Sequence, residues 1–263
     1  RVQALLSTAF DKGYIYCYSN ASMRNRLLQA FREILYPSYC LVCHVKIPMG
    51  DSKGSICQRC RDSIIPFNPP FCRKCGRTIK KAAFGENLCG ECETIHFFFE
   101  RAWTGYPYED TLKEAIHHFK YNHKPSLGSF LSGLLIRFVS DYHIPLTQCD
   151  YLIPIPLAQA KLREREFNQA RVLAINLSRH FGLPVVDNAL YRRRNTASQT
   201  GLDRSSRWKN IQGAFGVNNQ EAVKNKRVLL VDDVLTTGAT ASEAARALKG
   251  AGAQAVFVVT IAG

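Results

Sequence analysis

The chain has 263 residues, and its 35 Lys and Arg against 21 Asp and Glu give a formal net charge of +14. This length has room for one main domain of roughly 150 residues and a small module. No apolar run approaches the ~18 residues needed to cross a bilayer, so we expect a soluble, cytoplasmic protein and not a membrane protein.

The first segment of the chain shows no clear periodicity. From Met23 the sequence changes to MRNRLLQAFREILYP, whose apolar residues have helical spacing up to Pro37. No secretory signal peptide is visible. We therefore expect Met23 to be the natural start, residues 1–26 to be a disordered or non-native extension, and residues 27–96 to hold a helix followed by a small metal-binding module.

Eight of the ten cysteines form four Cys-x-x-Cys pairs. The pairs are Cys40/Cys43, Cys57/Cys60, Cys72/Cys75 and Cys89/Cys92. This spacing lets two thiolates from one tight turn reach a tetrahedral Zn²⁺. Thirteen residues separate the first pair from the second, and thirteen separate the third from the fourth, which indicates a repeated unit. Two sequential zinc ribbons, each with one structural zinc, are the simplest pairing, and a cross-braced pairing stays open.

Other uses of these thiols fit less well. Disulfides are typical of secreted chains, and catalytic redox pairs usually occur singly beside a thioredoxin-like pattern. His44 and His96 lie near the knuckles and stay open as replacements for a cysteine ligand. Cys17 and Cys149 stand alone, and we expect them to be free thiols.

Residues 97–263 alternate apolar runs with amphipathic stretches. The runs predict strands at 102–108, 151–155, 185–186, 228–231 and 255–261. The amphipathic stretches predict helices at 110–121, 126 to about 142, 157–181 and 241–250. Alternation of this kind predicts an α/β domain with a parallel sheet and a ligand site at the carboxyl ends of its strands.

The segment from Tyr191 to Lys209 is strongly basic. Its cations are Arg192, Arg193, Arg194, Arg204, Arg207 and Lys209, against the single acid Asp203. Hydrophobic periodicity is weak, so the segment is either a mobile loop that seeks phosphate or a solvated surface run. Tyr191 and Trp208 would add stacking surfaces for bases, which favours single-stranded DNA as a partner.

Residues 228–240 read VLLVDDVLTTGAT and predict a strand, a loop and the start of a helix. A phosphate on the loop would meet unpaired backbone N–H groups, threonine hydroxyls and the positive end of the helix dipole. The loop residues are Thr236, Thr237, Gly238, Ala239 and Thr240. Asp232 and Asp233, at the end of the strand, would accept hydrogen bonds from vicinal hydroxyls of a sugar. A ribose 5-phosphate group satisfies both halves.

This segment resembles the phosphoribosyl pyrophosphate (PRPP) motif of type I phosphoribosyltransferases. The resemblance implies that Asp232 and Asp233 bind the ribose hydroxyls and that residues 236–240 hold the 5′-phosphate. With the paired cysteines in front, the chain is similar to the ComF family, competence-associated proteins that join a double zinc ribbon to a phosphoribosyltransferase domain. Further similar segments are IHHFKY at 116–121, PIPL at 154–157, REFNQA at 165–170, and RWKN at 207–210 ahead of GAF at 213–215.

The resemblance also implies where the rest of PRPP binds. Ile155, Pro156 and Leu157 would lie near the diphosphate, whose charge Mg²⁺ would neutralise. Arg194, within the basic segment, would belong to a flexible loop that closes over PRPP. The nearest cation in sequence to the diphosphate turn is Lys161. An acceptor would be recognised by a variable hood built from residues about 97–142.

One residue departs from the family pattern. Glu166 stands where family members usually have glycine. If this position needs a positive φ, glutamate costs roughly 1 kcal/mol or more, and its carboxylate would repel a nearby pyrophosphate. Either the backbone there is ordinary, or this chain binds its ligand less tightly.

Two functions from different classes follow from the resemblance. The first is a PRPP-binding protein that handles single-stranded DNA during uptake, with DNA-uptake proteins at the inner membrane as possible partners. The second is an active phosphoribosyltransferase that transfers ribose 5-phosphate from PRPP to a nitrogen acceptor. No acceptor pocket or catalytic residue can be recognised in the sequence, which favours the binding role.

Overall fold

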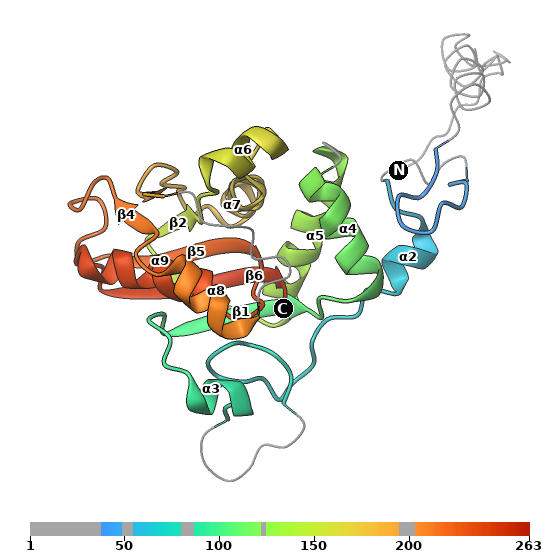
Figure 1. Ribbon diagram of the computed structural model, residues 1–263. Helices are drawn as coiled ribbons and strands as arrows, with labels where there is room; N and C mark the ends of the chain where they lie inside the picture. The colour runs from blue at the N-terminus through green and yellow to red at the C-terminus, as the bar shows by residue number, and fades with distance from the viewer. Residues whose placement is uncertain (1–37, 49–54, 80–86, 122–124, 195–202) are drawn as a thin grey trace, which may run out of the picture. The chain divides into compact units, whose positions relative to one another are not determined.

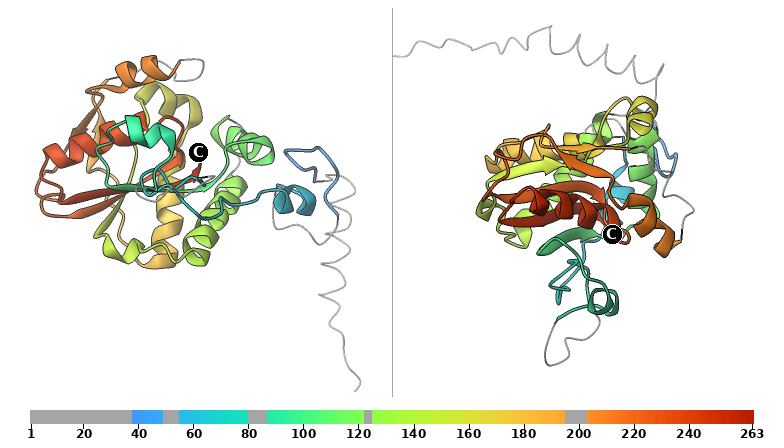
Figure 2. Two further views of the ribbon diagram at one scale, coloured as in Figure 1. Left: turned by 90° about the horizontal axis from the view of Figure 1, so that it is seen from below. Right: turned by 60° about the vertical axis from the view of Figure 1, so that its left-hand side comes forward.

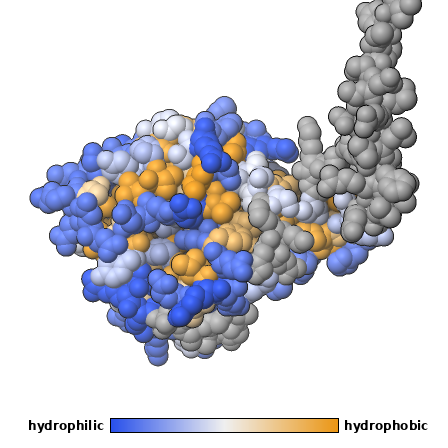
Figure 3. All heavy atoms as spheres, turned by 90° about the horizontal axis from the view of Figure 1, so that it is seen from above, coloured by the Kyte–Doolittle hydropathy of each residue, from blue (hydrophilic) through white to orange (hydrophobic). Residues whose placement is uncertain are grey.

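The computed structural model describes residues 38–48, 55–79, 87–121, 125–194 and 203–263. The helix expected before Pro37, the start expected at Met23 and the thiol of Cys17 lie outside the described residues. Within the described ranges no helix is long and apolar enough to span a bilayer. The face in Figure 3 is mostly hydrophilic, with apolar residues gathered near its middle.

Four parallel strands form the central sheet, in the order β1-β6-β5-β2 (Figure 1). Their bounds are β1 Arg101–Tyr106, β2 Tyr151–Pro154, β5 Arg227–Val234 and β6 Ala255–Ala262. The four apolar residues Val228 to Val231 of β5 are fully buried because helices cover both faces of the sheet. The predicted parallel α/β fold is therefore confirmed.

Two hydrophobic cores lie on the opposite faces of the sheet. Leu229 and Val231 of β5 belong to the first, the α5 core, which includes side chains of α4 (Asp110–Tyr121), α5 (Pro125–Asp141) and α7 (Gln169–Phe181). Val228 and Leu230 belong to the second, the α9 core, with α8 (Arg204–Ile211) and α9 (Ala239–Gly250). Successive residues of a strand point to opposite faces, so one short run supplies both cores.

The two cysteine-rich modules join different cores. The first ribbon, around Cys40–Cys60, contains α2 (Gln58–Asp62) and contributes to the α5 core. The second ribbon, around Cys72–Cys92, contains α3 (Gly90–Thr94) and contributes to the α9 core. Figures 1 and 2 show α2 beside α4 and α5, and α3 apart from them on the other side of the sheet.

The second ribbon also covers the free edge of β1. The carbonyl of Lys74 accepts a hydrogen bond from Ala102 N at 2.7 Å, and Phe67 N donates to the carbonyl of Gly105 at 2.9 Å. Gly76 has φ +78, and a Cβ at this position would lie 2.7 Å from the carbonyl oxygen of Ala102. Only glycine lets the knuckle approach the strand this closely.

The long helix expected over 157–181 is in fact two helices. The first, α6, runs over Gln159–Arg165, and Glu166 then takes a left-handed conformation with φ +64. Asn168 caps α7, because its Oδ1 accepts a hydrogen bond from Ala170 N at 3.1 Å. The expectation of one continuous helix was wrong, since this cap and the left-handed residue start a new helix. The alternative of an ordinary backbone at Glu166 was also wrong.

The basic segment contains more regular structure than a loop. The strand β3 (Leu190–Arg192) pairs antiparallel with β4 (Phe215–Val217), and α8 begins after Asp203, whose Oδ1 accepts from Ser206 N at 2.9 Å. The strand β3 pairs with β4 and the helix α8 packs against α9, both outside the segment. Because these partners stabilise them, their own hydrophobic periodicity can be weak. Residues 195–202 lie outside the described ranges.

Smaller differences concern the ends of the sheet. The strand expected at 185–186 is a single parallel bridge between Val185 and Leu152. The strand β1, which falls in the segment assigned to the hood, pairs with β6 and is part of the central sheet. A short 3-10 helix, η1 (Leu146–Gln148), leads into β2.

Candidate functional site

A cavity of about 500 Å³ opens at the carboxyl ends of β2 and β5. Nearly all the predicted PRPP-site residues line it, namely Ile155, Pro156, Leu157, Asp232, Asp233, Thr236, Thr237, Gly238, Ala239 and Thr240. Arg194 is not among the lining residues; its guanidinium donates to the carbonyls of Asn210 and Gln212, at 3.1 and 2.6 Å. The structure thus brings together two segments that are 75 residues apart in sequence, by pairing β2 with β5.

Gly238 sets the shape of the loop between β5 and α9. It is the N-cap of α9 and has φ +73. A Cβ at this position would lie 2.5 Å from Cε1 of Phe97. Because α9 begins here, the unpaired N–H groups and the positive end of its dipole face the cavity wall formed by residues 236–241. This wall is suited to an anion.

The two aspartates have different electrostatic surroundings. Asp233 pairs with Nζ of Lys120 at 2.7 Å, and the two side chains are only 12% and 17% exposed. Burial alone would raise the pKa of Asp233, but the charge and hydrogen bond of Lys120, together with the charge of Arg165, outweigh it and the pKa is lowered. Burial, together with the charge of Asp233, raises the pKa of Asp232 to about 7. Asp233 is therefore ionised and neutralised, whereas Asp232 titrates near neutral pH.

Four cations face these carboxylates across the cavity. Lys120 comes from α4, Lys161 and Arg165 from α6, and Arg192 from β3. The pKa of Lys161 is lowered by burial, and the charges of the other three lower it further. Sequence reasoning noted Lys161 near the diphosphate turn and the run Arg192 to Arg194 as a loop over PRPP, but not Lys120 or Arg165. Lys120 and Arg165 lie within the family-like segments IHHFKY and REFNQA, and that was the available signal.

Both arginines of this group have a side-chain N–H group without a hydrogen-bond partner among the described residues. Arg165 is 6% exposed, and its Nη atoms donate to Oε1 of Gln169 and to the hydroxyl of Tyr121, both at 3.2 Å. The Nε atoms of Arg165 and Arg192 are buried and have no hydrogen-bond partner among the described residues. Buried donors are normally satisfied, so an acceptor such as a bound anion is expected beside them.

The remaining cations of the basic segment have separate roles. Arg207 lines the cavity and its Nη1 donates to Oγ1 of Thr236 at 3.3 Å. Arg193 and Lys209 are exposed. Of the described cations of this segment, some line the cavity, Arg194 binds backbone carbonyls, and others face solvent. Neither a phosphate-seeking loop nor a solvated surface run describes all of them.

Each ribbon brings four thiols together. The Sγ atoms of Cys40, Cys43, Cys57 and Cys60 lie within 4.8 Å of one another, as do those of Cys72, Cys75, Cys89 and Cys92. The Sγ separations are 3.6 Å for Cys43 and Cys57 and 3.7 Å for Cys75 and Cys89, close to the ~3.8 Å between thiolates on one tetrahedral zinc. The thiols therefore fit two structural zinc ions in sequential pairing.

The histidines near the knuckles stay outside these groups. Neither His44 nor His96 belongs to a described cluster of metal-ligating side chains. Cys149, which the sequence left as a free thiol, is buried and has no disulfide. Its pKa is raised to about 11 by burial, which makes it unreactive.

Comparisons with known families agree with this architecture. Residues 31–93 match the double zinc ribbon domain, and residues 168–263 match the phosphoribosyl transferase domain. DNA utilization protein YhgH of Escherichia coli K12 is 30% identical over 229 residues, which cover 84% of this chain and 95% of that protein. Competence protein F of Haemophilus influenzae is 29% identical over 83% of this chain and 94% of that protein. Competence protein ComFC of Bacillus subtilis is 28% identical over 73% and 77%, respectively.

Solved structures give more distant likenesses. Glutamine PRPP amidotransferase of B. subtilis, solved with ADP and GMP, is 19% identical with a TM-score of 0.37, covering 54% of this chain and 30% of that one. A purine phosphoribosyltransferase of Pyrococcus horikoshii is 22% identical with a TM-score of 0.27, covering 50% and 70%.

Proposed function

Because this chain belongs to the ComF family, which joins a double zinc ribbon to a phosphoribosyltransferase domain, we propose that it binds PRPP and handles single-stranded DNA during DNA uptake. The observation that carries the PRPP proposal is the division of one cavity between carboxylates, cations and a helix N-terminus. A ligand with vicinal hydroxyls and two phosphate ends matches all three parts.

Each part of PRPP has a place in this proposal. The 5′-phosphate binds the loop 236–240, and the ribose hydroxyls hydrogen-bond to the carboxylate of Asp232. The diphosphate lies against Lys161, Arg165 and Arg192, where the unused Nε donors would find acceptors. Asp233 is already paired with Lys120, so its part is to orient that lysine unless the ligand displaces it.

Mg²⁺ completes the proposed ligand. The described residues place no third carboxylate or histidine beside Asp232 and Asp233 that would make a metal cluster. Magnesium is commonly held by one or two carboxylates together with substrate phosphates. The ion would therefore enter with PRPP and reduce the charge of its diphosphate.

Calorimetry tests the PRPP proposal directly. PRPP with Mg²⁺ should bind the wild type, and Asp232→Asn combined with Asp233→Asn should weaken binding by about tenfold to a hundredfold, because Asp232 loses its charge-assisted hydrogen bonds to the ribose and Lys120 loses the partner that orients it. Asp141→Asn, at an exposed position of α5, is the matched control. Unchanged affinity in the double variant would place the ligand elsewhere.

The DNA proposal rests on charge and on the relatives. The net charge of +14 falls to about +10 if each four-cysteine site binds one zinc as a dianionic complex. Exposed Tyr191, Arg193 and Lys209 offer one stacking surface and two phosphate contacts. The names of two relatives refer to competence and to DNA utilization. Uptake proteins at the inner membrane are then the proposed partners, and the thiol-rich ribbons suit a reducing cytoplasm.

Titration of labelled single-stranded DNA at several salt concentrations tests this second part. Two phosphate contacts should give a slope of log K against log salt of about −1.4. Replacing Arg193 and Lys209 with alanine should abolish most of that slope. Arg192 must be left intact, because it faces the cavity. Binding that is absent at low salt, or that ignores the double change, would reject the DNA role of this surface.

Phosphoribosyl transfer is the second candidate, because the cavity is larger than the PRPP site just described. It continues along α4 and the turn before it, where Tyr108, Lys113 and His117 line it. This space would admit an acceptor beside the ribose. Release of pyrophosphate from PRPP with any member of a panel of bases, or with ammonia, would establish transfer and displace the pure binding role.

A further inference from the structure

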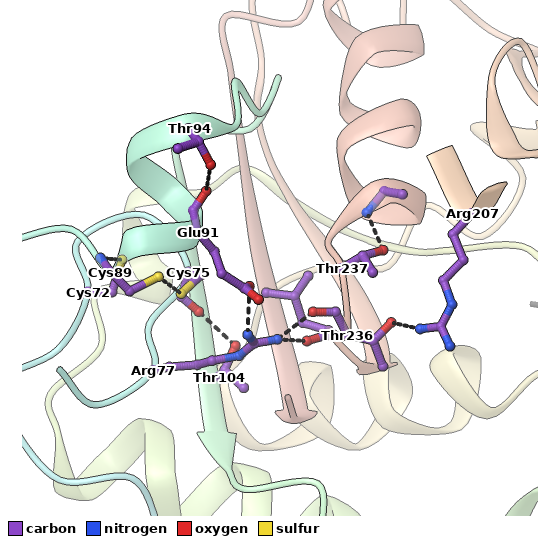
Figure 4. A network of polar contacts seen from close by, with 12 residues as sticks. Cys72, Cys75, Arg77, Cys89, Glu91, Thr94, Thr104, Arg207, Thr236 and Thr237 are labelled. Atoms are coloured by element: carbon purple, nitrogen blue, oxygen red, sulfur yellow. Dashed lines mark hydrogen bonds and ion pairs between the residues drawn. The ribbon is translucent and has the colours of Figure 1, made fainter. Parts of the chain in front are cut away.

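Arg77 connects the second ribbon to the start of the phosphate loop (Figure 4). Its Nη2 donates to the carbonyl of Leu235 at 2.6 Å and to the carbonyl of Thr236 at 2.5 Å. These two carbonyls belong to the turn by which β5 enters the loop 236–240. A single side chain from a metal module therefore fixes the backbone immediately before the candidate phosphate site.

The position of Arg77 depends on both knuckles of the ribbon. Its backbone carbonyl accepts a hydrogen bond from Cys72 N at 2.8 Å, which closes the first knuckle. Its Nη1 pairs with Oε2 of Glu91 at 3.2 Å, and Glu91 lies between Cys89 and Cys92 in the second knuckle. A zinc ion would join these knuckles through four thiolates. Loss of the metal would separate the two knuckles, and the guanidinium of Arg77 would no longer be held in place.

The segment after the ribbon holds the other side of the loop. Phe97 packs where a Cβ of Gly238 would be, and Phe98 N donates to Oγ of Ser242 in the first turn of α9 at 3.0 Å. The loop is therefore held between Arg77, at its beginning, and Phe97, at the start of the helix. Arg77 lies two residues after Cys75, and Phe97 lies five residues after Cys92, so both contacts come from residues close in sequence to the second cysteine tetrad.

We propose that zinc bound by Cys72, Cys75, Cys89 and Cys92 orders the phosphate loop through Arg77, so that zinc at this tetrad and PRPP strengthen each other's binding. This inference rests on the proposed binding of PRPP. Coupling between two sites is reciprocal, so PRPP must raise the equilibrium affinity of this tetrad for zinc by the same factor by which zinc improves PRPP binding. No such coupling is expected for the first tetrad, whose residues join the α5 core.

Zinc release to a chromophoric chelator tests the coupling without any measurement of catalysis. At equilibrium with the chelator the wild type should give up two zinc equivalents, and saturating PRPP with Mg²⁺ should raise the chelator concentration needed to remove one of them by about tenfold, within the usual range for coupled sites. Cys57→Ser, which disrupts the first tetrad, should leave one releasable zinc that PRPP still protects. Protection of both equivalents, or of neither, would overturn the inference.

Variants of Arg77 identify the connecting side chain. Arg77→Ala should keep two zinc equivalents but lose the protection by PRPP, and PRPP affinity should fall by about tenfold. Arg77→Lys should restore part of both, because ammonium can still donate to a carbonyl. Arg73→Ala, an exposed arginine of the same knuckle, should behave as wild type. Full protection in folded Arg77→Ala would remove this residue from the connection.

Two outcomes separate this inference from the function on which it rests. If calorimetry detects no binding of PRPP to the wild type, the proposed function fails. If PRPP binds and the release of both zinc equivalents is unchanged, only the coupling fails. The wild-type comparison needs no substitution, so a variant that does not fold cannot obscure the result.

Discussion

The two ribbons repeat one local structure in two different settings. Each begins with an antiparallel bridge next to its first cysteine, Tyr39 with Lys46 and Phe71 with Thr78. The first ribbon meets α4 through the hydroxyls of Ser63 and Thr111, 2.9 Å apart, whereas the second meets the phosphate loop through Arg77. Both ribbons have four cysteines at the same spacing. Their different contacts therefore come from the residues that flank the cysteines.

The two ribbons pack against opposite faces of the sheet. The first packs into the α5 core, beside the helix that carries Lys120. The second packs into the α9 core, beneath the loop at the start of α9. Among the described residues, the first ribbon is hydrogen-bonded to Thr111, at the start of α4, whereas the second ribbon is hydrogen-bonded to the candidate phosphate loop itself.

Removing one zinc ligand from each ribbon should give the largest effects. We expect Cys60→Ser and Cys92→Ser each to lower the free energy of unfolding by about 4 kcal/mol, as is usual for loss of a structural metal. Hydrogen exchange should then increase in α4 and α5 for Cys60→Ser, and in residues 235–242 for Cys92→Ser. Identical exchange patterns in the two variants would show that the two ribbons do not support different parts of the domain.

Gly238→Ala should have the next largest effect. The left-handed φ of +73 and the approach of Phe97 to 2.5 Å from an added Cβ together predict a loss of about 2 kcal/mol in unfolding free energy. Combining it with Phe97→Ala should restore part of that loss, because the clash is removed while the backbone strain remains. Denaturant unfolding of the four proteins measures this coupling. Strictly additive effects would mean that Phe97 does not touch the loop.

Asp232→Asn should stabilise the free protein by about 1 kcal/mol above pH 7. The raised pKa of about 7 means that the folded protein holds a proton which the unfolded chain has already lost. Wild-type stability therefore falls as pH rises from about 4 to 7, and the asparagine variant lacks this fall. Thermal unfolding at pH 5 and pH 8 should show the advantage growing with pH. The opposite trend would show that Asp232, like Asp233, has a cation as its partner.

Ser63→Ala should have the smallest effect. Its hydroxyl contact with Thr111 is exposed, so we expect a loss of about 0.5 kcal/mol in unfolding free energy. PRPP affinity should not change, because this contact lies at the first ribbon. A drop in PRPP affinity comparable to that of Arg77→Ala would erase the distinction between the two ribbons.

The sequence revealed the features that depend on neighbouring residues. The Cys-x-x-Cys knuckles and the strand, loop and helix of residues 228–250 each lie within a short window, so spacing and periodicity indicated them. The parallel sheet followed from the alternation of such units. A positive φ at Glu166 was one of the alternatives that the resemblance raised, but the helix was still predicted to be continuous, because one left-handed residue leaves helical periodicity almost unchanged on both sides.

The cation side of the cavity could not be predicted in this way. Lys120, Arg165 and Arg192 come from three elements that only the tertiary fold brings together. The strand β3 and helix α8 were hidden for a similar reason, since each takes its stability from β4 or α9 and not from its own pattern. Arg194 was favoured in place of Arg192 because sequence alone does not show which member of an arginine run faces inward.

The cover over β1 has a consequence for the protein without zinc. This edge strand presents backbone groups that the second ribbon satisfies through Lys74 and Phe67. An uncovered strand edge is a template for pairing with another chain. If loss of metal withdraws the ribbon, the exposed edge would recruit strands from neighbouring molecules, and aggregation would remove the metal-free protein before it could be reloaded.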